Sequence, residues 1–332
     1  MKAVVFSDEE GLKLDNNYPK PVAQRGEALI KVTMAGICNT DYEITKGYMG
    51  YNGVLGHEFI GIVEEVNIEG ISDDLAQKGK SLVGKRVTAE ISYGCDDPNC
   101  EWCAVKNYRH CPNRHTLGIV AKDGCMAEYV TMPINVIFEI PNEVEDEQAV
   151  FVEPLAAACE ITEQLHIQPI QKVVVLGDGK LGLTTALTLH AQCLDVTLIG
   201  KHRNKLDIAK AQGVKTILLN DAEINNSYDV VVEATGSVSG FETSLGLVKP
   251  RGVLVLKSTI ATGKELNLAP IVINEITVLG SRCGQFKPAL HLLKNKRIDF
   301  KPFISKVYSV DDAIEAFEAN KQKDTIKILL KF

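Results

Sequence analysis

The segment Lys172-Val173-Val174-Val175-Leu176-Gly177-Asp178-Gly179-Lys180-Leu181-Gly182 passes from an apolar run into three spaced glycines and then into an apolar-periodic stretch. This pattern predicts a strand, a tight turn and a helix that runs from residue 181 to about residue 192. Gly177 allows the sharp turn, Gly179 lets backbone N–H groups approach a pyrophosphate, and Gly182 lets the helix pack closely on the strand. The helix N-terminus then faces the anion, so we expect residues 177–182 to bind a dinucleotide.

More strands and helices are expected after this turn. Further apolar runs occupy residues 195–199, 216–219, 228–234, 252–257 and 276–280. Helical patterns such as residues 205–212 lie between them, and strands that alternate with helices are typical of a parallel sheet. Three spaced glycines alone also fit an ordinary turn before a helix. The alternation favours a six-strand, doubly wound α/β domain of the Rossmann type.

A second domain is expected, because 332 residues exceed what one core usually accommodates and the glycine turn begins only near residue 172. Segments such as 28–34, 59–63 and 127–132 are short, often alternating and punctuated by glycine, which is typical of a β-rich, barrel-like module. We expect a strand over 301–307 and a helix over about 311–320, capped by Ser309, to return to that module. The expected boundaries are 1–150 with 285–332 for the β-rich domain and 151–284 for the Rossmann domain.

The composition indicates which binding partners and which cellular compartment to expect. The net charge is −7, and no segment gathers five or six basic residues, so nothing indicates nucleic acid or an anionic membrane. The first residues lack a signal-peptide apolar region, and no apolar run is long enough to cross a bilayer. We expect a cytoplasmic protein. Its nine cysteines then favour metal ligands or free thiols over disulfides.

Two clusters of residues offer metal ligands. Cys38 lies in the segment GICNTD (36–41), and His57 and Glu58 lie in GHE (56–58), so thiolate, imidazole and carboxylate are all available for zinc. Sequence separation also allows a buried cysteine and a structural histidine that never meet. Glu153, at the junction of the two domains, favours the metal site. The second cluster consists of four thiols within seventeen residues, Cys95, Cys100, Cys103 and Cys111.

Together and in this order, these segments resemble the zinc-dependent medium-chain alcohol dehydrogenases, within them the branch of polyol, glucose and threonine dehydrogenases. The resemblance covers nearly the whole chain. It implies a GroES-like, β-rich catalytic domain and a Rossmann coenzyme domain. It also implies a zinc-dependent oxidoreductase that transfers a hydride between a secondary alcohol, sugar or polyol and NAD(P), assembled as a homodimer or homotetramer.

The resemblance also implies roles for single residues. Cys38 and His57 match the catalytic zinc ligands, and Glu153 stands where better-known members place a second cysteine. Glu58 is the alternative carboxylate. A zinc ion in this site makes a bound alcohol easier to deprotonate.

A proton relay is implied next to these ligands. Thr40 matches the hydroxyl that relays the alcohol proton, and Asp41 matches the carboxylate that orients the zinc-bound histidine. Many members carry a histidine five residues after the zinc cysteine, whereas this chain has Glu43. Glu43 could pass protons with a lower reference pKa, or could be a surface residue without a role.

The four clustered cysteines resemble the family's structural-zinc loop. The spacings from Cys100 to Cys103 and to Cys111 match that loop, but four residues separate Cys95 from Cys100 where the family has two. A closed four-thiolate zinc site is expected. The alternative is a lobe that holds no metal.

The residues at the end of the second Rossmann strand indicate whether the cofactor is NAD or NADP. NAD-binding proteins of this fold carry an acidic residue there, but the expected strand ends at Gly200 and continues into Lys201-His202-Arg203. Two fixed cations without a carboxylate favour NADP over NAD. The alternative is that these side chains only solvate a loop.

A rival function belongs to another class. It is a non-catalytic nucleotide-binding redox sensor or structural relative that keeps the fold and has lost turnover. The joint presence of Cys38, Thr40, His57 and Glu153 argues against it, because such a relative does not need a complete zinc and relay set. The sequence does not identify the substrate.

Overall fold

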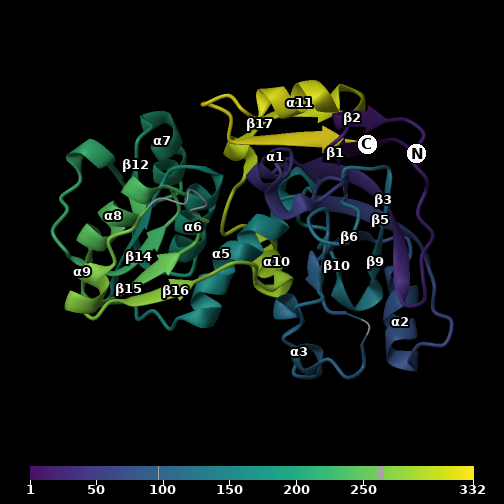
Figure 1. The fold of residues 1–332 in the computed structure, drawn as a ribbon, viewed down its shortest axis with the longest axis horizontal. Helices are drawn as coiled ribbons and strands as arrows, with labels where there is room; N and C mark the ends of the chain where they lie inside the picture. The colour runs from purple at the N-terminus through teal and green to yellow at the C-terminus, as the bar shows by residue number, and fades with distance from the viewer. Residues whose placement is uncertain (96, 260–264) are drawn as a thin grey trace. The chain divides into compact units, whose positions relative to one another are not determined.

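The computed structural model describes residues 1–95, 97–259 and 265–332. The chain forms two compact units, Met1–Glu153 with Ile304–Phe332, and Pro154–Phe303 (Figure 1). The domain boundaries expected from the sequence remain a prediction. No helix in the described ranges combines the length and apolarity that a bilayer crossing requires.

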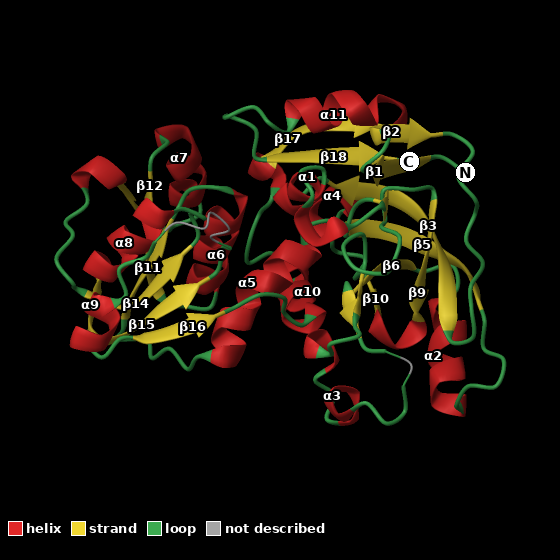
Figure 2. Cartoon of the chain, viewed as in Figure 1, coloured by secondary structure: helices red, strands yellow, loops and turns green. Residues whose placement is uncertain are grey.

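The second unit is built on a six-stranded, wholly parallel sheet, as the sequence predicts (Figure 2). Its strands, in spatial order, are β13 (Lys215–Leu218), β12 (Asp195–Gly200), β11 (Lys172–Leu176), β14 (Tyr228–Glu233), β15 (Val248–Leu256) and β16 (Thr277–Gly280). The chain runs outward from β11 through β12 to β13 and then continues at β14 on the other side. The strand order therefore reverses between β11 and β14, which is the point where such sheets bind dinucleotides.

Helices connect and flank these strands. They are α5 (Val152–Gln164), α6 (Lys180–Ala191), α7 (Arg203–Ala211), η4 (Leu219–Asp221), α8 (Val238–Leu247), α9 (Ala269–Ile273), α10 (Phe286–Lys294) and η5 (Lys301–Phe303). One cluster of buried apolar residues lies between α8 and the sheet, where Val174, Val231 and Leu254 of the strands pack with Phe241 of the helix. Because β11 is covered on both faces, its residues read as an unbroken apolar run.

The first unit is β-rich, as expected. A three-stranded sheet contains β2 (Gly11–Asp15), β1 (Ala3–Ser7) and β4 (Gly53–Val54). A seven-stranded sheet contains β10 (Ile137–Glu139), β6 (Arg86–Ala89), β5 (Glu58–Val66), β3 (Glu27–Gly36), β18 (Lys327–Lys331) and β17 (Ile304–Ser309), and β9 (Tyr129–Pro133) also pairs with β3. A short ribbon joins β7 (Ser92–Tyr93) and β8 (His115–Thr116).

Short helices connect the strands of the first unit. They are α1 (Asn39–Ile44), η1 (Tyr48–Gly50), α2 (Asp73–Leu82), α3 (Glu101–Ala104), η2 (Tyr108–His110), η3 (Ile134–Val136), α4 (Asp146–Ala149), η6 (Val310–Asp312) and α11 (Ala313–Ala319).

The C-terminal segment completes the large sheet. β18 pairs antiparallel with the end of β3, so that Leu329 lies opposite Gly36 and Leu330 opposite Ala35. The two side chains of this β18 stretch are fully buried. The last strand of the chain therefore fixes the end of β3, two residues before Cys38.

Two expected elements in this segment are shorter than predicted. Residues 301–303 form the 3₁₀ turn η5, and the strand begins only at Ile304. Pro302 has no N–H for a sheet ladder, which accounts for the delayed start. The expected helix begins at Ala313, because Ser309 accepts a hydrogen bond from Asp311 N and caps the 3₁₀ turn η6 instead.

The glycine turn has the geometry that the sequence predicts. Gly177 has φ +119°, in the region that favours glycine. A Cβ at Gly182 would lie 1.9 Å from the carbonyl oxygen of Gly177, whereas a Cβ at Gly179 would meet nothing within 4 Å. Gly182 therefore permits the close approach of α6 to the turn after β11.

We predict that Gly182→Ala lowers the free energy of unfolding by about 1–3 kcal/mol, because the added methyl group must displace backbone. Gly179→Ala is the matched control, and we expect it to change stability by less than about 1 kcal/mol because the site is open and its φ of −75° suits alanine. Urea unfolding of both variants measures the difference. Equal stability of the two variants would contradict the packing role of Gly182.

Candidate functional site

A buried carboxylate, Asp41 of α1, joins the two segments that carry the first set of metal ligands. Its Oδ2 accepts a hydrogen bond from Cys38 N at 2.8 Å, and its Oδ1 accepts one from Gly56 N at 3.1 Å. Oδ1 also lies 3.3 Å from His57 Nδ1, although the angle falls outside hydrogen-bond geometry. Asp41 thus holds the end of β3 and the start of β5 at a fixed separation.

Cys38, His57 and Glu58 meet in one group, which the sequence predicts as a zinc site. Each offers one ligand atom, and the three atoms lie within 4.8 Å of one another. His57 and Glu58 are buried. Thiolate, imidazole and carboxylate within this distance fit a zinc ion that keeps an open position for another ligand.

The charges around Cys38 and His57 favour the ionised form of the Cys38 thiol. Burial raises the pKa of Cys38, but the charge and hydrogen bond of His57 outweigh it and lower the thiol pKa to about 6. Burial lowers the pKa of His57, yet Asp41 and Cys38 together raise it well above its usual value. The thiolate form that binds metal is therefore favoured near neutral pH, while the imidazole must release a proton when a metal binds.

Glu58 has a second partner that sequence reasoning missed. Lys327 of β18 forms an ion pair with Glu58 Oε2, and both residues are at least 97% buried. Burial lowers the pKa of Lys327, and the charges of Cys38 and Asp41 raise it. Burial is the larger influence, so the pKa falls to about 8. The two residues are 269 positions apart in the chain, and no local pattern relates them. Only the pairing of β18 with β3 brings Lys327 to this group.

The two expected proton-relay residues, Thr40 and Glu43, lie in different environments. Thr40 Oγ1 lies 3.7 Å from Cys38 Sγ, so its hydroxyl is beside the ligand group. Glu43 instead forms an ion pair with Lys46 at 2.8 Å on an exposed face, with about half of its side chain accessible. The structure therefore brings Thr40 to the ligands but gives Glu43 a surface contact.

Glu153 lies in the first turn of α5, at the end of the first unit. Its charge reaches the buried Cys125 thiol, where it is one of the smaller influences that raise the thiol pKa. Glu153 is not a member of the close group formed by Cys38, His57 and Glu58. Its role as a zinc ligand remains a prediction.

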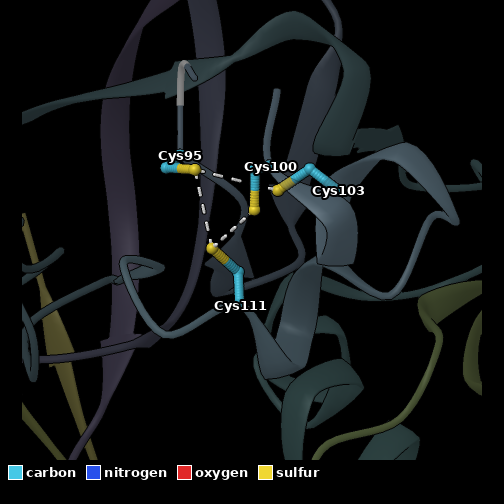
Figure 3. Close-up of side chains that lie close together, drawn as sticks. All are labelled: Cys95, Cys100, Cys103 and Cys111. Carbon is cyan, nitrogen blue, oxygen red and sulfur yellow. Dashed lines mark hydrogen bonds between the residues drawn. The ribbon is translucent and has the colours of Figure 1, made fainter. Parts of the chain in front are cut away.

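The four clustered thiols converge as a second group (Figure 3). The Sγ atoms of Cys95 and Cys111 are 3.6 Å apart, those of Cys100 and Cys111 3.7 Å, and those of Cys95 and Cys103 4.0 Å. Four sulfur ligands at about 2.3 Å from zinc require S–S separations of about 3.8 Å. The thiols thus fit a tetrahedral zinc site, and the unusual spacing after Cys95 does not prevent it.

The dinucleotide turn lies at the carboxyl edge of β11. Gly179 is the N-cap of α6, so the backbone N–H groups of Lys180, Leu181 and Gly182 belong to the first turn of the helix, directly beyond the glycine turn. Asp178 Oδ2 accepts a hydrogen bond from His202 N at 2.6 Å. The residues expected to bind a dinucleotide therefore adjoin the end of β12, where Gly200 lies.

Comparisons with known proteins agree with this geometry. Residues 24–142 match the alcohol dehydrogenase GroES-like domain, and residues 146–332 match the glucose dehydrogenase C-terminus. The D-arabitol-phosphate dehydrogenase of Enterococcus avium is 30% identical over 333 residues, which cover 94% of this chain and 91% of that protein. The chain belongs to the zinc-containing medium-chain alcohol dehydrogenases.

Other relatives of this alcohol dehydrogenase carry related names. The sorbitol dehydrogenase of Halalkalibacterium halodurans is 28% identical over 330 residues, covering 94% of this chain and 93% of that protein. A zinc-binding dehydrogenase from Sinorhizobium meliloti 1021, solved bound to NADP, superposes with a TM-score of 0.87 at 26% identity and covers 100% of this chain and 99% of that one. These similarities identify an NAD(P)-dependent dehydrogenase of the polyol and alcohol class.

An alcohol dehydrogenase from Escherichia coli CFT073, complexed with NADH, gives the same TM-score of 0.87 at 25% identity, covering 100% of this chain and 99% of that one. One solved relative thus holds NADP and another NADH. The family fold is therefore compatible with either cofactor, and the choice must depend on the residues around the adenosine ribose.

For the dehydrogenase's thiol cluster, we predict that Cys103→Ser lowers the free energy of unfolding by roughly 3 kcal/mol or more, because a structural metal contributes directly to folding. Elemental analysis should show the loss of one zinc ion per chain. Cys193→Ser is the matched control, since Cys193 is exposed and lies outside both ligand groups. Unchanged zinc content and stability in Cys103→Ser would contradict the structural site.

Proposed function

We propose that the enzyme interconverts a secondary alcohol of a sugar or polyol with its carbonyl, using a catalytic zinc ion held by Cys38, His57 and a carboxylate. The observation that carries the proposal is the buried group of Cys38, His57 and Glu58, whose ligand atoms lie within 4.8 Å. The names of the sorbitol and D-arabitol-phosphate dehydrogenases support a polyol substrate. Family resemblance also supports a homodimer or homotetramer.

We assign each step of the reaction to a residue or a bound group. Zinc would supply Lewis-acid polarisation of the alcohol oxygen, and the nicotinamide would supply the hydride acceptor. Thr40 would take the alcohol proton, because its hydroxyl lies 3.7 Å from the Cys38 ligand atom. Asp41 would keep the His57 ring oriented through its carboxylate at 3.3 Å. Glu43 has no role in this scheme, since it pairs with Lys46 on the surface.

The identity of the carboxylate ligand follows from competition for Glu58. Its carboxylate is engaged by the Lys327 ammonium in a buried ion pair. A zinc ion would have to compete with this cation, and separating a buried pair leaves a charge without its partner. We therefore propose Glu153 as the carboxylate ligand or immediate neighbour of zinc, with Glu58 in a supporting position.

The prediction for the two carboxylates is that Glu153→Ala lowers kcat more than Glu58→Ala. Glu58→Ala should instead lower stability by about 3–5 kcal/mol, because it leaves the buried Lys327 without its counter-charge. Steady-state kinetics, zinc content and urea unfolding of both variants separate the two effects.

The double variant Glu58→Gln with Lys327→Met is the control, and it should recover much of the lost stability because neither charge remains. Full zinc content and turnover in both single variants would show that neither carboxylate serves the metal.

We propose that the thiol cluster holds a second, structural zinc ion, so that the purified enzyme contains two zinc ions per chain with different roles. The S–S distances of 3.6–4.0 Å support this assignment. Without a metal, burial and the neighbouring thiols raise the pKa of Cys103 to about 12. A bound cation removes this obstacle to ionisation, because it stabilises the thiolates.

We propose NADP as the preferred cofactor. β12 ends at Gly200, so the strand itself supplies no carboxylate that would repel a 2′-phosphate. Lys201 follows β12 directly and Arg203 is the first residue of α7; both are exposed, and within the part of the chain that the structure describes neither has an ion-pair partner. A guanidinium and an ammonium at this edge would attract the additional phosphate.

We predict that Arg203→Ala raises KM for NADP far more than KM for NAD, since each lost charge-assisted contact costs on the order of 1.5–3 kcal/mol. Lys210→Ala is the matched control, because Lys210 is an exposed cation in the last turn of the same helix. Initial rates at varied cofactor concentration measure both constants. A higher kcat/KM for NAD than for NADP in the wild-type enzyme would contradict the proposed preference.

The function itself is tested by turnover. Zinc-replete enzyme should oxidise members of a panel of sugars, polyols and their phosphates with concurrent formation of reduced nicotinamide, and a chelator that removes the catalytic zinc should abolish this activity while the fold persists. A protein that binds cofactor but turns over no member of an alcohol and carbonyl panel would favour a non-catalytic role instead.

A further inference from the structure

The space beside Gly200 is occupied by a side chain from the turn that follows the neighbouring strand β11. An ideal Cβ on Gly200 would lie 2.5 Å from Asp178 Cβ and 2.6 Å from Asp178 Oδ2. Asp178 belongs to the glycine turn after β11, and Gly200 is the last residue of β12. The two parallel strands are paired up to Leu176 and Ile199, so the two residues meet at the same edge of the sheet.

The Asp178 carboxylate is fixed in this place. Oδ2 accepts the hydrogen bond from His202 N at 2.6 Å, and both carboxylate oxygens lie 3.1 Å from His202 Nδ1. Only 7% of Asp178 is exposed. His202 can donate at most two hydrogen bonds here, whereas a carboxylate offers about four acceptor positions. Asp178 therefore retains capacity to accept from another donor.

In dinucleotide-binding folds of this type, an acidic residue at the end of the second strand accepts hydrogen bonds from the adenosine ribose. This chain has glycine at that position but brings a carboxylate to the same corner from the preceding turn. We propose that Asp178 is a specificity-determining residue, which accepts a hydrogen bond from the ribose 2′-hydroxyl of NAD and repels the 2′-phosphate of NADP. The inference rests on the proposed cofactor site and deepens it.

The preference of the wild-type enzyme then depends on opposing charges around one turn. Lys201 and Arg203 attract a 2′-phosphate, whereas the Asp178 carboxylate repels it. His202, which lies between the two cations in the sequence, contacts Asp178. Two unit charges about 4 Å apart interact by a few kcal/mol at the effective dielectric constant of a protein surface. A single carboxylate is thus able to offset much of the attraction of the two cations and to keep NAD usable.

The variant Asp178→Asn tests this role, because asparagine keeps the size of the side chain and an oxygen that accepts from His202 N–H but removes the negative charge. Isothermal titration calorimetry with the zinc-replete enzyme gives Kd for NADP and NAD, and for the fragments 2′,5′-ADP and 5′-AMP. We expect the ratio of Kd for NAD to Kd for NADP to rise at least tenfold, and the fragment pair to change in the same direction.

Two further variants control the comparison. Asp207→Asn removes the same charge from an exposed position of α7 and should leave both ratios unchanged. Asp178→Ser keeps a hydroxyl acceptor in a smaller side chain and should produce the same shift as Asp178→Asn, so that the test survives if one variant folds poorly.

Ratios in Asp178→Asn that stay within twofold of wild type, with an unchanged Tm, would overturn the inference and leave Asp178 as a residue that only fixes the turn. Wild-type preference for NAD combined with a shift toward NADP in Asp178→Asn would support the role of Asp178 while refuting the proposed NADP preference. Absence of binding of either dinucleotide to the wild-type enzyme would refute both.

Discussion

The ligand set for the catalytic zinc depends on one buried carboxylate. Asp41 is fully buried, and it accepts hydrogen bonds from Cys38 N and Gly56 N while its Oδ1 lies 3.3 Å from the His57 ring. Without it, the turn after β3 and the segment before β5 would have no shared anchor, and two backbone N–H groups would be left without their acceptor. The separation of thiolate and imidazole is therefore set by a residue that need not touch the metal.

A second buried charge connects the end of the chain to the same group. Lys327 reaches Glu58 because β18 pairs with β3. When β18 completes the sheet, the Lys327 ammonium therefore also compensates the charge of the Glu58 carboxylate. Burial of one partner alone would be costly, whereas the pair is tolerated. The C-terminal strand thus contributes both to the fold of the catalytic unit and to the availability of a potential zinc ligand.

Features with a local cause were predictable from the sequence, and long-range pairings were not. Gly177 and Gly182 predict the turn and the close packing of α6, because both constraints act within six residues. The partnership of Lys327 with Glu58 has no sequence signal, since it depends on which strands neighbour β3. The sequence shows that the strand end at Gly200 lacks a carboxylate, but Asp178 of the turn after β11 fills that space, which only the pairing of β11 with β12 reveals.

We propose that Cys38 and His57 bind a zinc ion distinct from the ion held by the thiol cluster. Anomalous scattering measured on either side of the zinc absorption edge, from crystals of the enzyme grown without a chelator, tests it most directly. We predict two peaks per chain, one about 2.3 Å from Cys38 Sγ and about 2.0–2.1 Å from a His57 ring nitrogen, and one surrounded by four sulfur atoms. A zinc-replete crystal with no peak between Cys38 and His57 would contradict it.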